Sequence, residues 1–343
     1  GSLPPYPFQR LRALLDDHAP PAGLAPINLS IGEPQDPPPA LITEALTAEA
    51  GSWNRYPPMA GTPALRAAAT GWLTRRFGLP AAMLDAERHL LPLSGTREGL
   101  YLVNQLLLGP DAAKRRVLVP NPFYQVYLGG AALAGGEPEF VPATEQTGFL
   151  PDLGALPPET LDATALAFLC SPSNPEGAVA DRARLREAVD LARRHGFVLV
   201  VDECYADVYT GDPPPGALEI CAEDGGDLTN VLVFHSLSKR SSAAGLRSGF
   251  VAGDPELIAA FKALRSYGGA ALPLPVQAAS AALWNDDAHA AVLRDGFRRR
   301  FAAAAERGFP VPAGGFFLWL PVGDGEETAL RLWRDAGLRT LPG

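Results

Sequence analysis

The sequence predicts an α/β protein in which a large domain with a doubly wound, mostly parallel sheet is joined to a smaller α+β domain. The chain has 343 residues, more than one average domain. Apolar residues make up 47% of it and charged residues 20%, so a sizeable core can form. In the middle of the chain, short apolar runs alternate with segments of helical periodicity, a pattern typical of parallel sheets.

Four apolar runs in this middle part are candidate strands. They lie at residues 117–119, 165–169, 197–201 and 231–234. Between the second and the third, apolar residues recur at helical spacing from Leu185 to Ala192; Asp181 can cap the start of this helix and Gly196 can end it. Strands that alternate with helices in this way predict a largely parallel sheet.

The last part of the chain has a different pattern, which indicates a second domain. After about Pro273, Arg-rich helical segments lead to a Pro-Ala-Gly-Gly turn at 312–315 and to the strand-like run 316–320. We therefore expect residues 36–272 to form the large domain and residues 273–343 the small C-terminal domain. Residues 1–35 are expected to form an N-terminal arm and part of the small domain.

Composition narrows the classes of function. The net charge of −9 and the pI of about 5.1 disfavour nucleic-acid binding through a basic face and favour small-molecule chemistry. The three cysteines are an odd number without close pairing, which is typical of buried thiols in a reducing compartment. No apolar run approaches the roughly 20 residues that span a bilayer, and no signal peptide opens the chain. We expect a cytoplasmic protein that binds no metal, nucleic acid or membrane.

Polar side chains follow each of the four candidate strands. Tyr124 comes after the first strand and Asn174 after the second, while Asp202 and Tyr205 come after the third. Ser236, Ser238 and Lys239 follow the fourth. Each of these residues alone has a structural explanation, such as a turn or a helix cap. Ligands bind at the carboxyl ends of strands in such sheets, so all of them together favour a functional site at one edge.

Lys239 is one of only three lysines, and its setting differs from that of the other two. Lys114 and Lys262 lie in stretches that suit solvated side chains, whereas Lys239 lies among serines and glycines directly after an apolar run. A lysine amine has an ordinary pKa of about 10.4, and burial or a neighbouring cation lowers it and frees the amine as a nucleophile.

An anion site is predicted at residues 94–97. Gly95, Thr96 and Arg97 precede a segment in which apolar residues recur at helical spacing from Leu100. Backbone N–H groups at such a helix start, together with nearby hydroxyls, can hold a phosphate group. Arg247, eight residues after Lys239, offers a guanidinium fork for phosphate oxygens.

These groups meet the requirements of pyridoxal phosphate. Its aldehyde reacts with a lysine, its ring nitrogen pairs with a carboxylate, its O3′ binds phenol and amide donors, and its phosphate binds N–H groups, hydroxyls and arginine. The chain, from Gly32 to its end, resembles the fold-type I pyridoxal phosphate-dependent enzymes of the class I and II aminotransferase family. The match includes a Tyr-Pro-Pro-Met-Ala-Gly segment that starts at Tyr56 and a Ser-Asn-Pro-Glu-Gly segment in which Glu176 replaces the family's Thr.

The resemblance implies a role for each matched residue. Lys239 would bond the cofactor, and Asp202 and Tyr205 would act with it in catalysis. The cofactor-binding residues would be Tyr56, Gly95, Thr96, Arg97, Tyr124, Asn174, Asp202, Tyr205, Ser236, Ser238, Lys239 and Arg247. Tyr56 would reach the cofactor phosphate of a partner subunit, which implies a homodimer with shared active sites. Gly32 and Asn174 would contact the substrate.

Within the family, the residues around Lys239 are most similar to the succinyldiaminopimelate aminotransferases of lysine biosynthesis. This similarity implies N-succinyl-LL-2,6-diaminopimelate as the amino donor and 2-oxoglutarate as the acceptor. The family also has an arginine that binds the substrate α-carboxylate beyond a Leu-Pro-Gly sequence like residues 341–343, where this sequence stops. We expect that the small domain lacks its last segment here or that the carboxylate is bound in another way.

Other functions remain open at this point. The chemistry could be that of an aspartate or other amino-acid aminotransferase, a pyridoxal phosphate-dependent β-lyase or a decarboxylase, because the cofactor motifs are shared. A non-catalytic effector-binding domain is a further alternative. Residues 236–239 also fit the Ser-x-x-Lys motif of β-lactamases, but the Ser-Asp-Asn and Lys-Thr-Gly motifs that accompany it do not occur. His235 is interpreted as a packed neighbour and not as a base.

Overall fold

The large sheet carries the candidate site, and its topology confirms the predicted fold class. The structure is a computed structural model that describes every residue except 1, 2, 4 and 5, which belong to the expected N-terminal arm and so lie outside the described residues. Seven strands are hydrogen-bonded in the order β2-β8-β7-β6-β5-β3-β4. β8 is the strand that runs antiparallel to its neighbours. The strands are β2 (Leu90–Leu93), β3 (Arg116–Asn121), β4 (Glu137–Pro142), β5 (Thr164–Cys170), β6 (Val198–Asp202), β7 (Val231–Ser236) and β8 (Gly249–Gly253).

The four predicted strands are β3, β5, β6 and β7, and they form the centre of this sheet. Their apolar runs are nearly continuous because both faces of the sheet are covered. On β6, Leu199 and Val201 belong to the core on one face, while Val198 and Val200 belong to the core on the other. The sheet is therefore a rigid support for the residues that follow its strands.

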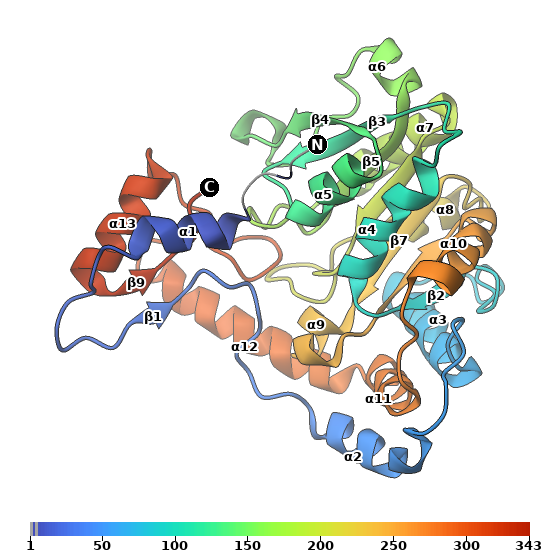
Figure 1. Ribbon diagram of the computed structural model, residues 1–343, viewed down its shortest axis with the longest axis horizontal. Helices are drawn as coiled ribbons and strands as arrows, with labels where there is room; N and C mark the ends of the chain where they lie inside the picture. The colour runs from blue at the N-terminus through green and yellow to red at the C-terminus, as the bar shows by residue number, and fades with distance from the viewer. Residues whose placement is uncertain (1–2, 4–5) are drawn as a thin grey trace.

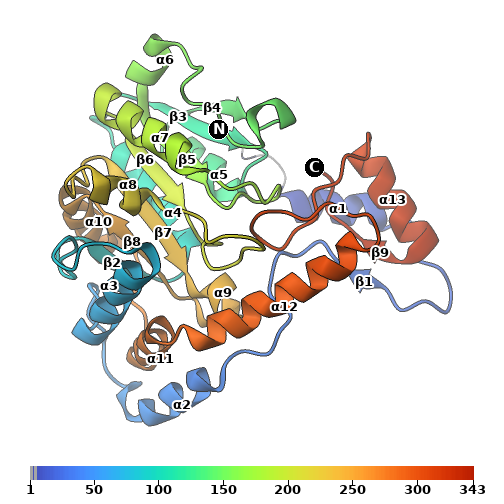
Figure 2. The same ribbon diagram turned by 180° about the vertical axis from the view of Figure 1, so that it is seen from behind.

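Helices cover both faces of the sheet, as Figures 1 and 2 show. One core is completed by α4 (Thr96–Leu107), α5 (Gln125–Leu133) and α10 (Pro255–Gly268). The other core is completed by α3 (Pro63–Phe77), α7 (Arg182–His195), α8 (Ala217–Glu223) and α11 (Leu274–Asn285), and α6 (Pro158–Asp162) packs near α7. The predicted helix ends of α7 are confirmed: Asp181 Oδ1 accepts from the backbone N–H of Arg184 at 2.8 Å, and Gly196 has the left-handed φ of 65° that ends a helix.

A smaller unit lies beside the large sheet. It consists of α1 (Pro7–Leu15), β1 (Ile27–Asn28), α13 (Gly325–Ala336) and β9 (Leu338–Arg339), and we call it the small unit. β1 pairs in parallel with β9, and Trp333 Nε1 donates to the backbone oxygen of His18 at 2.7 Å. α12 (Ala288–Ala305) runs from the end of α11 to this unit (Figure 2).

The domain boundary expected at residue 273 stays a prediction. The helix that follows it, α11, packs against α3 and against α2 (Ala40–Ala48) of the N-terminal half. The chain then passes into α12 and reaches the small unit only at the far end of that helix (Figure 1).

The expected strand at 316–320 is wrong. The segment has no strand pairing within the described residues; the one bridge nearby joins Gly314 to Tyr209. The reason lies in its aromatic side chains. Phe316 packs against Tyr205 and Phe297, and Phe317 packs against Tyr205, so the segment is held by ring contacts beside the candidate site.

In the part of the chain that the structure describes, no helix is both long and apolar enough to cross a membrane. The same residues contain no group of three His, Cys, Asp or Glu side chains that could hold a metal ion. Cys170, Cys204 and Cys221 are free thiols.

Candidate active site

Lys239 lies at the carboxyl end of β7, in the single turn α9 (Leu237–Arg240). Its Nζ donates a hydrogen bond to the backbone oxygen of Gly32, 207 residues earlier in the chain. Burial lowers the pKa of the Lys239 amine below its ordinary value, and the charge of Arg247 acts in the same direction, against the negative charges of Glu33 and Asp202. A half-buried amine of this kind is partly deprotonated at a lower pH than a fully exposed lysine.

Asp202 ends the neighbouring strand β6, and two donors hold its carboxylate. Tyr127 Oη donates to Oδ2 at 2.7 Å, and the backbone N–H of Cys204 donates to Oδ1 at 3.2 Å. The Tyr127 ring is stacked on Phe168 with 4.4 Å between the ring centroids, so its hydroxyl is fixed. The sequence interpretation missed Tyr127. Its position three residues after Tyr124, on the first turn of α5, was the available signal.

Tyr205 presents a buried phenol beside the lysine. Its ring centroid is 6.0 Å from Lys239 Nζ, and the Phe316 centroid is 5.4 Å from the same atom. Burial raises the pKa of the Tyr205 hydroxyl well above its ordinary value, so this group keeps its proton and remains a hydrogen-bond donor. Phe316 and Phe317 pack edge-on against the Tyr205 ring.

Tyr124 and Asn174 lie at the ends of β3 and β5. Arg97 Nε donates to the Tyr124 hydroxyl at 2.6 Å, and burial raises the pKa of that hydroxyl. Asn174 and Glu176 line a small cavity together with Tyr124 and Tyr127. Burial raises the pKa of the Glu176 carboxyl, and its Oε1 has no hydrogen-bond partner among the described residues. Nothing in the structure explains why Glu stands at this position.

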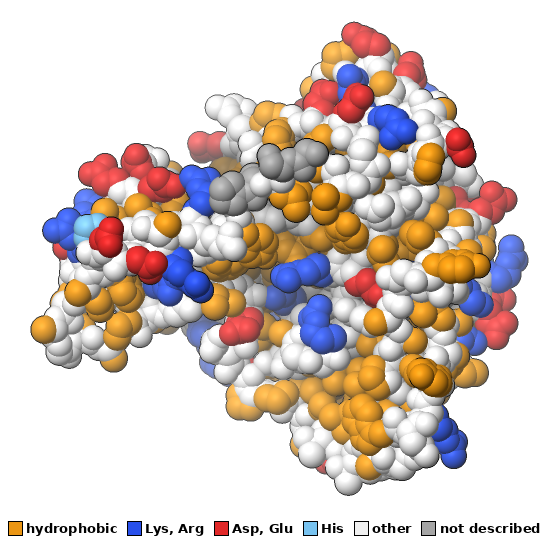
Figure 3. Space-filling model, viewed as in Figure 1, with side chains coloured by type: hydrophobic (Ala, Val, Ile, Leu, Met, Phe, Trp, Pro, Cys, Tyr) orange, Lys and Arg blue, Asp and Glu red, His pale blue; other side chains and the backbone are white. Residues whose placement is uncertain are grey.

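The predicted anion site is a cradle built around Gly95. Gly95 precedes α4 with a φ of 82°, which favours glycine, and a Cβ atom at this position would clash with the guanidinium of Arg247. Thr96 opens the helix, so its first backbone N–H groups have no partners within the helix. Arg97 and Arg247 are both exposed here. On this face of the molecule, basic side chains gather between the large sheet and the small unit, with apolar side chains around them (Figure 3).

Two further groups stiffen this cradle, and the sequence interpretation missed both. Glu98 Oε2 accepts from the backbone N–H of Ser94 at 2.8 Å, and Arg265 Nη2 lies 3.0 Å from the same oxygen. Arg265 is buried and also donates to the backbone oxygen of Pro92 at 2.6 Å. The pair thus joins the loop before α4 to the end of α10. Only contact geometry reveals it, since residues 98 and 265 are far apart in the chain.

Ser236 and Ser238, which flank Leu237 just before Lys239, belong to the start of α9. Ser236 Oγ accepts from the backbone N–H of Ser238 at 3.1 Å and caps α9. Both serines are buried. His235 is packed as expected: its Nε2 lies 2.9 Å from Glu203 Oε2, and both side chains are almost inaccessible to solvent.

The structure brings together Gly32, Lys239, Asp202 and Tyr205, but it leaves Tyr56 outside. The Tyr56 side chain is fully exposed, with a relative accessibility of 102%, and makes no hydrogen bond among those of the described residues. The arrangement of the other groups offers a half-buried amine, a fixed carboxylate, a protonated phenol and a cationic cradle for an anion. Such a set can hold a phosphorylated ring compound and move a proton beside it.

Comparisons with known proteins give the family of this chain. Residues 25–341 match the family described as aminotransferase class I and II. The chain is 35% identical over 356 residues to the LL-diaminopimelate aminotransferase of Desulforudis audaxviator (100% of this chain, 88% of that protein). It is 40% identical over 329 residues to the 4-dedimethylamino-4-oxo-anhydrotetracycline transaminase OxyQ of Streptomyces rimosus (92% and 84%). A solved probable N-succinyldiaminopimelate aminotransferase of Thermus thermophilus is similar with a TM-score of 0.84 and 29% identity (97% and 90%).

Proposed function

We propose, from the premise that this chain belongs to the class I and II aminotransferase family, that it moves an amino group from N-succinyl-LL-2,6-diaminopimelate to 2-oxoglutarate. The family is dependent on pyridoxal phosphate and acts on amino acids and 2-oxo acids. The observation that carries the chemistry is the half-buried Lys239, held at Gly32 next to Tyr205 and with a lowered pKa. The substrate is inferred from the similarity to enzymes that are named for diaminopimelate and N-succinyldiaminopimelate.

The residues present fit pyridoxal phosphate. A Cβ atom at Gly95 would clash with the Arg247 guanidinium, and Gly95 directly precedes the start of α4, where backbone N–H groups have no partners within the helix, as suits an anion site. Asp202 is held by two donors at the end of the next strand, where its negative charge can pair with a protonated ring nitrogen. The residues proposed to hold the group are Gly95, Thr96, Arg97, Tyr124, Asn174, Asp202, Tyr205, Ser236, Ser238, Lys239 and Arg247.

When bound, pyridoxal phosphate supplies an electron sink that stabilises negative charge on the carbon bearing the substrate amino group. Lys239 is the proposed base at that carbon: its amine would take the proton on Nζ and would give it up again on the cofactor side of the transferred nitrogen, not at the carbon it came from. The lowered pKa raises the fraction of neutral amine near neutral pH, which is the form that accepts a proton.

The other side chains orient the reactants and exclude water. Tyr205 keeps its proton because burial raises its pKa, so its hydroxyl can donate to an oxygen of the cofactor ring. Asp202 stays in place because Tyr127 and the backbone of Cys204 donate to it. The backbone of Gly32 is proposed to lie beside the substrate, since its oxygen already accepts from Lys239.

We also propose a homodimer with shared active sites. Tyr56 is fully exposed, and Trp53 and Tyr267 are large aromatic side chains with high exposure as well. Exposed aromatic side chains are typical of interfaces between subunits. A dimer in which Tyr56 reaches the anion cradle of the partner subunit would give this side chain a function. Sedimentation at assay concentration tests the dimer, and an active monomer would contradict the proposal.

The cytoplasm is the proposed location, because the substrates belong to amino-acid biosynthesis.

A panel of amino donors tests the proposed reaction. The enzyme would be mixed with N-succinyl-LL-2,6-diaminopimelate, LL-2,6-diaminopimelate, aspartate or cystathionine, each with and without 2-oxoglutarate, and glutamate would be measured. We expect turnover with the succinylated donor that requires 2-oxoglutarate and is absent in Lys239→Ala. Preference for aspartate or for free diaminopimelate would correct the donor. Ammonia release without 2-oxoglutarate would instead show a lyase.

A further inference from the structure

We propose that the buried ion pair of Asp207 and Arg240 is a positioning device, which fixes the turn bearing Lys239 against the loop bearing Tyr205 and against the start of α12. We call residues 237–240 the lysine turn. The inference rests on the proposed role of Lys239 as the reacting amine, but it does not depend on which amino donor the enzyme uses.

The lysine turn cannot hold its own shape. α9 contains four residues, and a helix of this length is unstable without tertiary contacts. Lys239 reaches from it toward Gly32, Tyr205 and Phe316. Arg240, the next residue, makes a different set of contacts. A side chain that anchors this turn therefore decides where the amine lies.

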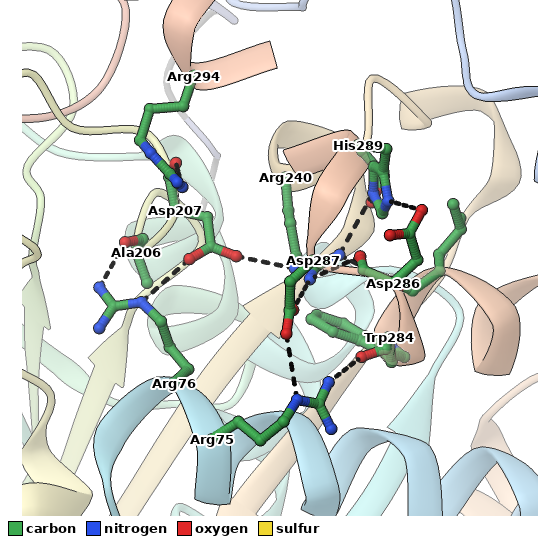
Figure 4. A network of polar contacts seen from close by, with 12 residues as sticks. Arg75, Arg76, Ala206, Asp207, Arg240, Trp284, Asp286, Asp287, His289 and Arg294 are labelled. Atoms are coloured by element: carbon green, nitrogen blue, oxygen red, sulfur yellow. Dashed lines mark hydrogen bonds and ion pairs between the residues drawn. The ribbon is translucent and has the colours of Figure 1, made fainter. Parts of the chain in front are cut away.

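Asp207 connects the lysine turn to the phenol. It follows Tyr205 by two residues, and its Oδ2 lies 2.8 Å from Arg240 Nε. Its Oδ1 lies 3.0 Å from Arg76 Nε, on α3. The side chains of Arg240 and Asp207 are 3% and 7% exposed, so the pair is shielded from solvent and salt. Figure 4 shows Asp207 between the two arginines.

Arg240 also binds the junction of α11 and α12. It donates to the backbone oxygens of Leu283 at 2.8 Å and Asp286 at 3.1 Å, and to Asp287 Oδ1 at 2.6 Å. Its guanidinium lies near the indole rings of Trp72 and Trp284, at 5.6 and 5.3 Å from the centroids. A planar fork can make these contacts at once, whereas a lysine ammonium on the same backbone cannot.

The position of the turn affects the amine because burial is the main cause of its lowered pKa. The titratable groups that act on Lys239 are Cys204, Glu33 and Asp202, which raise its pKa, and Arg247, which lowers it. If the turn loosens, water reaches the amine and its pKa returns toward the ordinary value. The fraction of neutral amine then falls at neutral pH, and the distance to the Tyr205 hydroxyl is no longer fixed.

The test uses the enzyme loaded with pyridoxal phosphate and two readouts. One is the pH titration of its visible absorbance, which reports the ionisation linked to the lysine–cofactor bond. The other is kcat and KM with whichever amino donor turns over. The variants are Arg240→Lys, which keeps the charge, and Asp207→Asn, which keeps the shape. Arg75→Lys is the matched control, because Arg75 binds Asp287 and the Trp284 backbone but touches neither Asp207 nor the lysine turn.

For both variants we expect the titration midpoint to rise and kcat to fall by about 10- to 100-fold, the effect of a small displacement of a reacting group. KM should change by less than about threefold, because no group that contacts substrate is altered. The variant that combines Arg240→Lys with Asp207→Asn should have about the same kcat as the slower of the two single variants, since the two residues act as a unit. Arg75→Lys should keep the wild-type midpoint and kcat.

A folded Arg240→Lys enzyme with the wild-type midpoint and kcat would refute the proposal, whatever its melting temperature. If Asp207→Asn does not fold, Asp287→Asn replaces it, because that side chain is 55% exposed. It must then give a smaller shift of the midpoint in the same direction, and no shift would refute the proposal. Failure of the succinylated donor in the donor panel would leave the titration unaffected, so the two proposals can fail separately.

Discussion

The two sides of the candidate active site are built in different ways. Asp202 ends β6 and Lys239 lies in the turn after β7, and these strands are buried, with Leu199 of β6 fully inaccessible to solvent. The side that supplies Gly32 continues from β1 of the small unit, where Ile27 and Leu29 are 53% and 60% exposed. One side is embedded between two cores, and the other is attached to a two-stranded sheet.

With the proposed roles of these residues, this difference would separate the groups that carry the chemistry from the groups that select the substrate. Most of the groups proposed to hold the cofactor, such as Asp202 and Tyr205, lie on the buried side, whereas Arg97 and Arg247 are exposed. Gly32, which is proposed to lie beside the substrate, is on the side with fewer buried contacts. Two relatives that are 35% and 40% identical over most of this chain have names that refer to very different compounds. A constant buried side and a variable exposed side would account for that.

Removal of the amine on the buried side should have the largest effect. Lys239→Ala deletes the proposed base and the bond to the cofactor, so we expect turnover to fall by at least about 1,000-fold and the visible absorbance of the loaded enzyme to disappear. Absorption spectroscopy and a glutamate assay measure both. Lys262→Ala, at an exposed position of α10, is the control and should behave as wild type. A yellow, active Lys239→Ala protein would overturn the assignment of the reacting amine.

Removal of the carboxylate should reduce turnover without the loss of cofactor. Asp202→Ala leaves the anion cradle and Lys239 in place, so binding persists, while turnover should fall by about 100-fold or more because the electron sink is weakened. Tyr127→Phe removes one donor to Asp202 and should cost about 1 kcal/mol, or roughly five- to tenfold in rate. Titration with pyridoxal phosphate and steady-state kinetics separate binding from turnover. A near-wild-type rate for Asp202→Ala would contradict its role.

The difference between the buried side and the exposed side also explains how much of the structure could be predicted from the sequence. The four strands, α7 and the strand-end residues were predictable, because buried parallel strands are continuous apolar runs and their ends meet at one edge. Tyr127, Glu98 and Arg265 were missed, since their roles depend on contacts between distant residues. The strand expected at 316–320 was wrong because its rings pack on Tyr205 and Phe297. An apolar run does not reveal whether it has a strand partner.

A pair of leucines measures the difference in stability between the two sides. Leu199→Ala creates a cavity between packed layers and should lower the free energy of unfolding by about 2–5 kcal/mol. Leu29→Ala removes a side chain that is largely exposed and should change it by less than about 0.5 kcal/mol. Denaturant unfolding of both variants gives the values. Equal losses would show that the exposed side is more tightly packed in solution, for example within a dimer.

A substitution at the junction between the two sides should have the smallest effect, a change in stability that is visible only as the pH falls. His289, in the first turn of α12, accepts or donates a hydrogen bond with Ser241 Oγ at 2.8 Å. Burial lowers its pKa below the ordinary 6.5, and Arg240 acts in the same direction, while Asp286 and Asp207 oppose them. The unfolded chain therefore binds a proton more readily than the folded protein does. This contribution to stability is complete above pH 6.5 and is lost as the pH falls through that value toward the lower folded pKa. His289→Gln should flatten the decline of the melting temperature in that range and leave the slope above it unchanged; identical slopes for both proteins below pH 6.5 would show that His289 does not contribute.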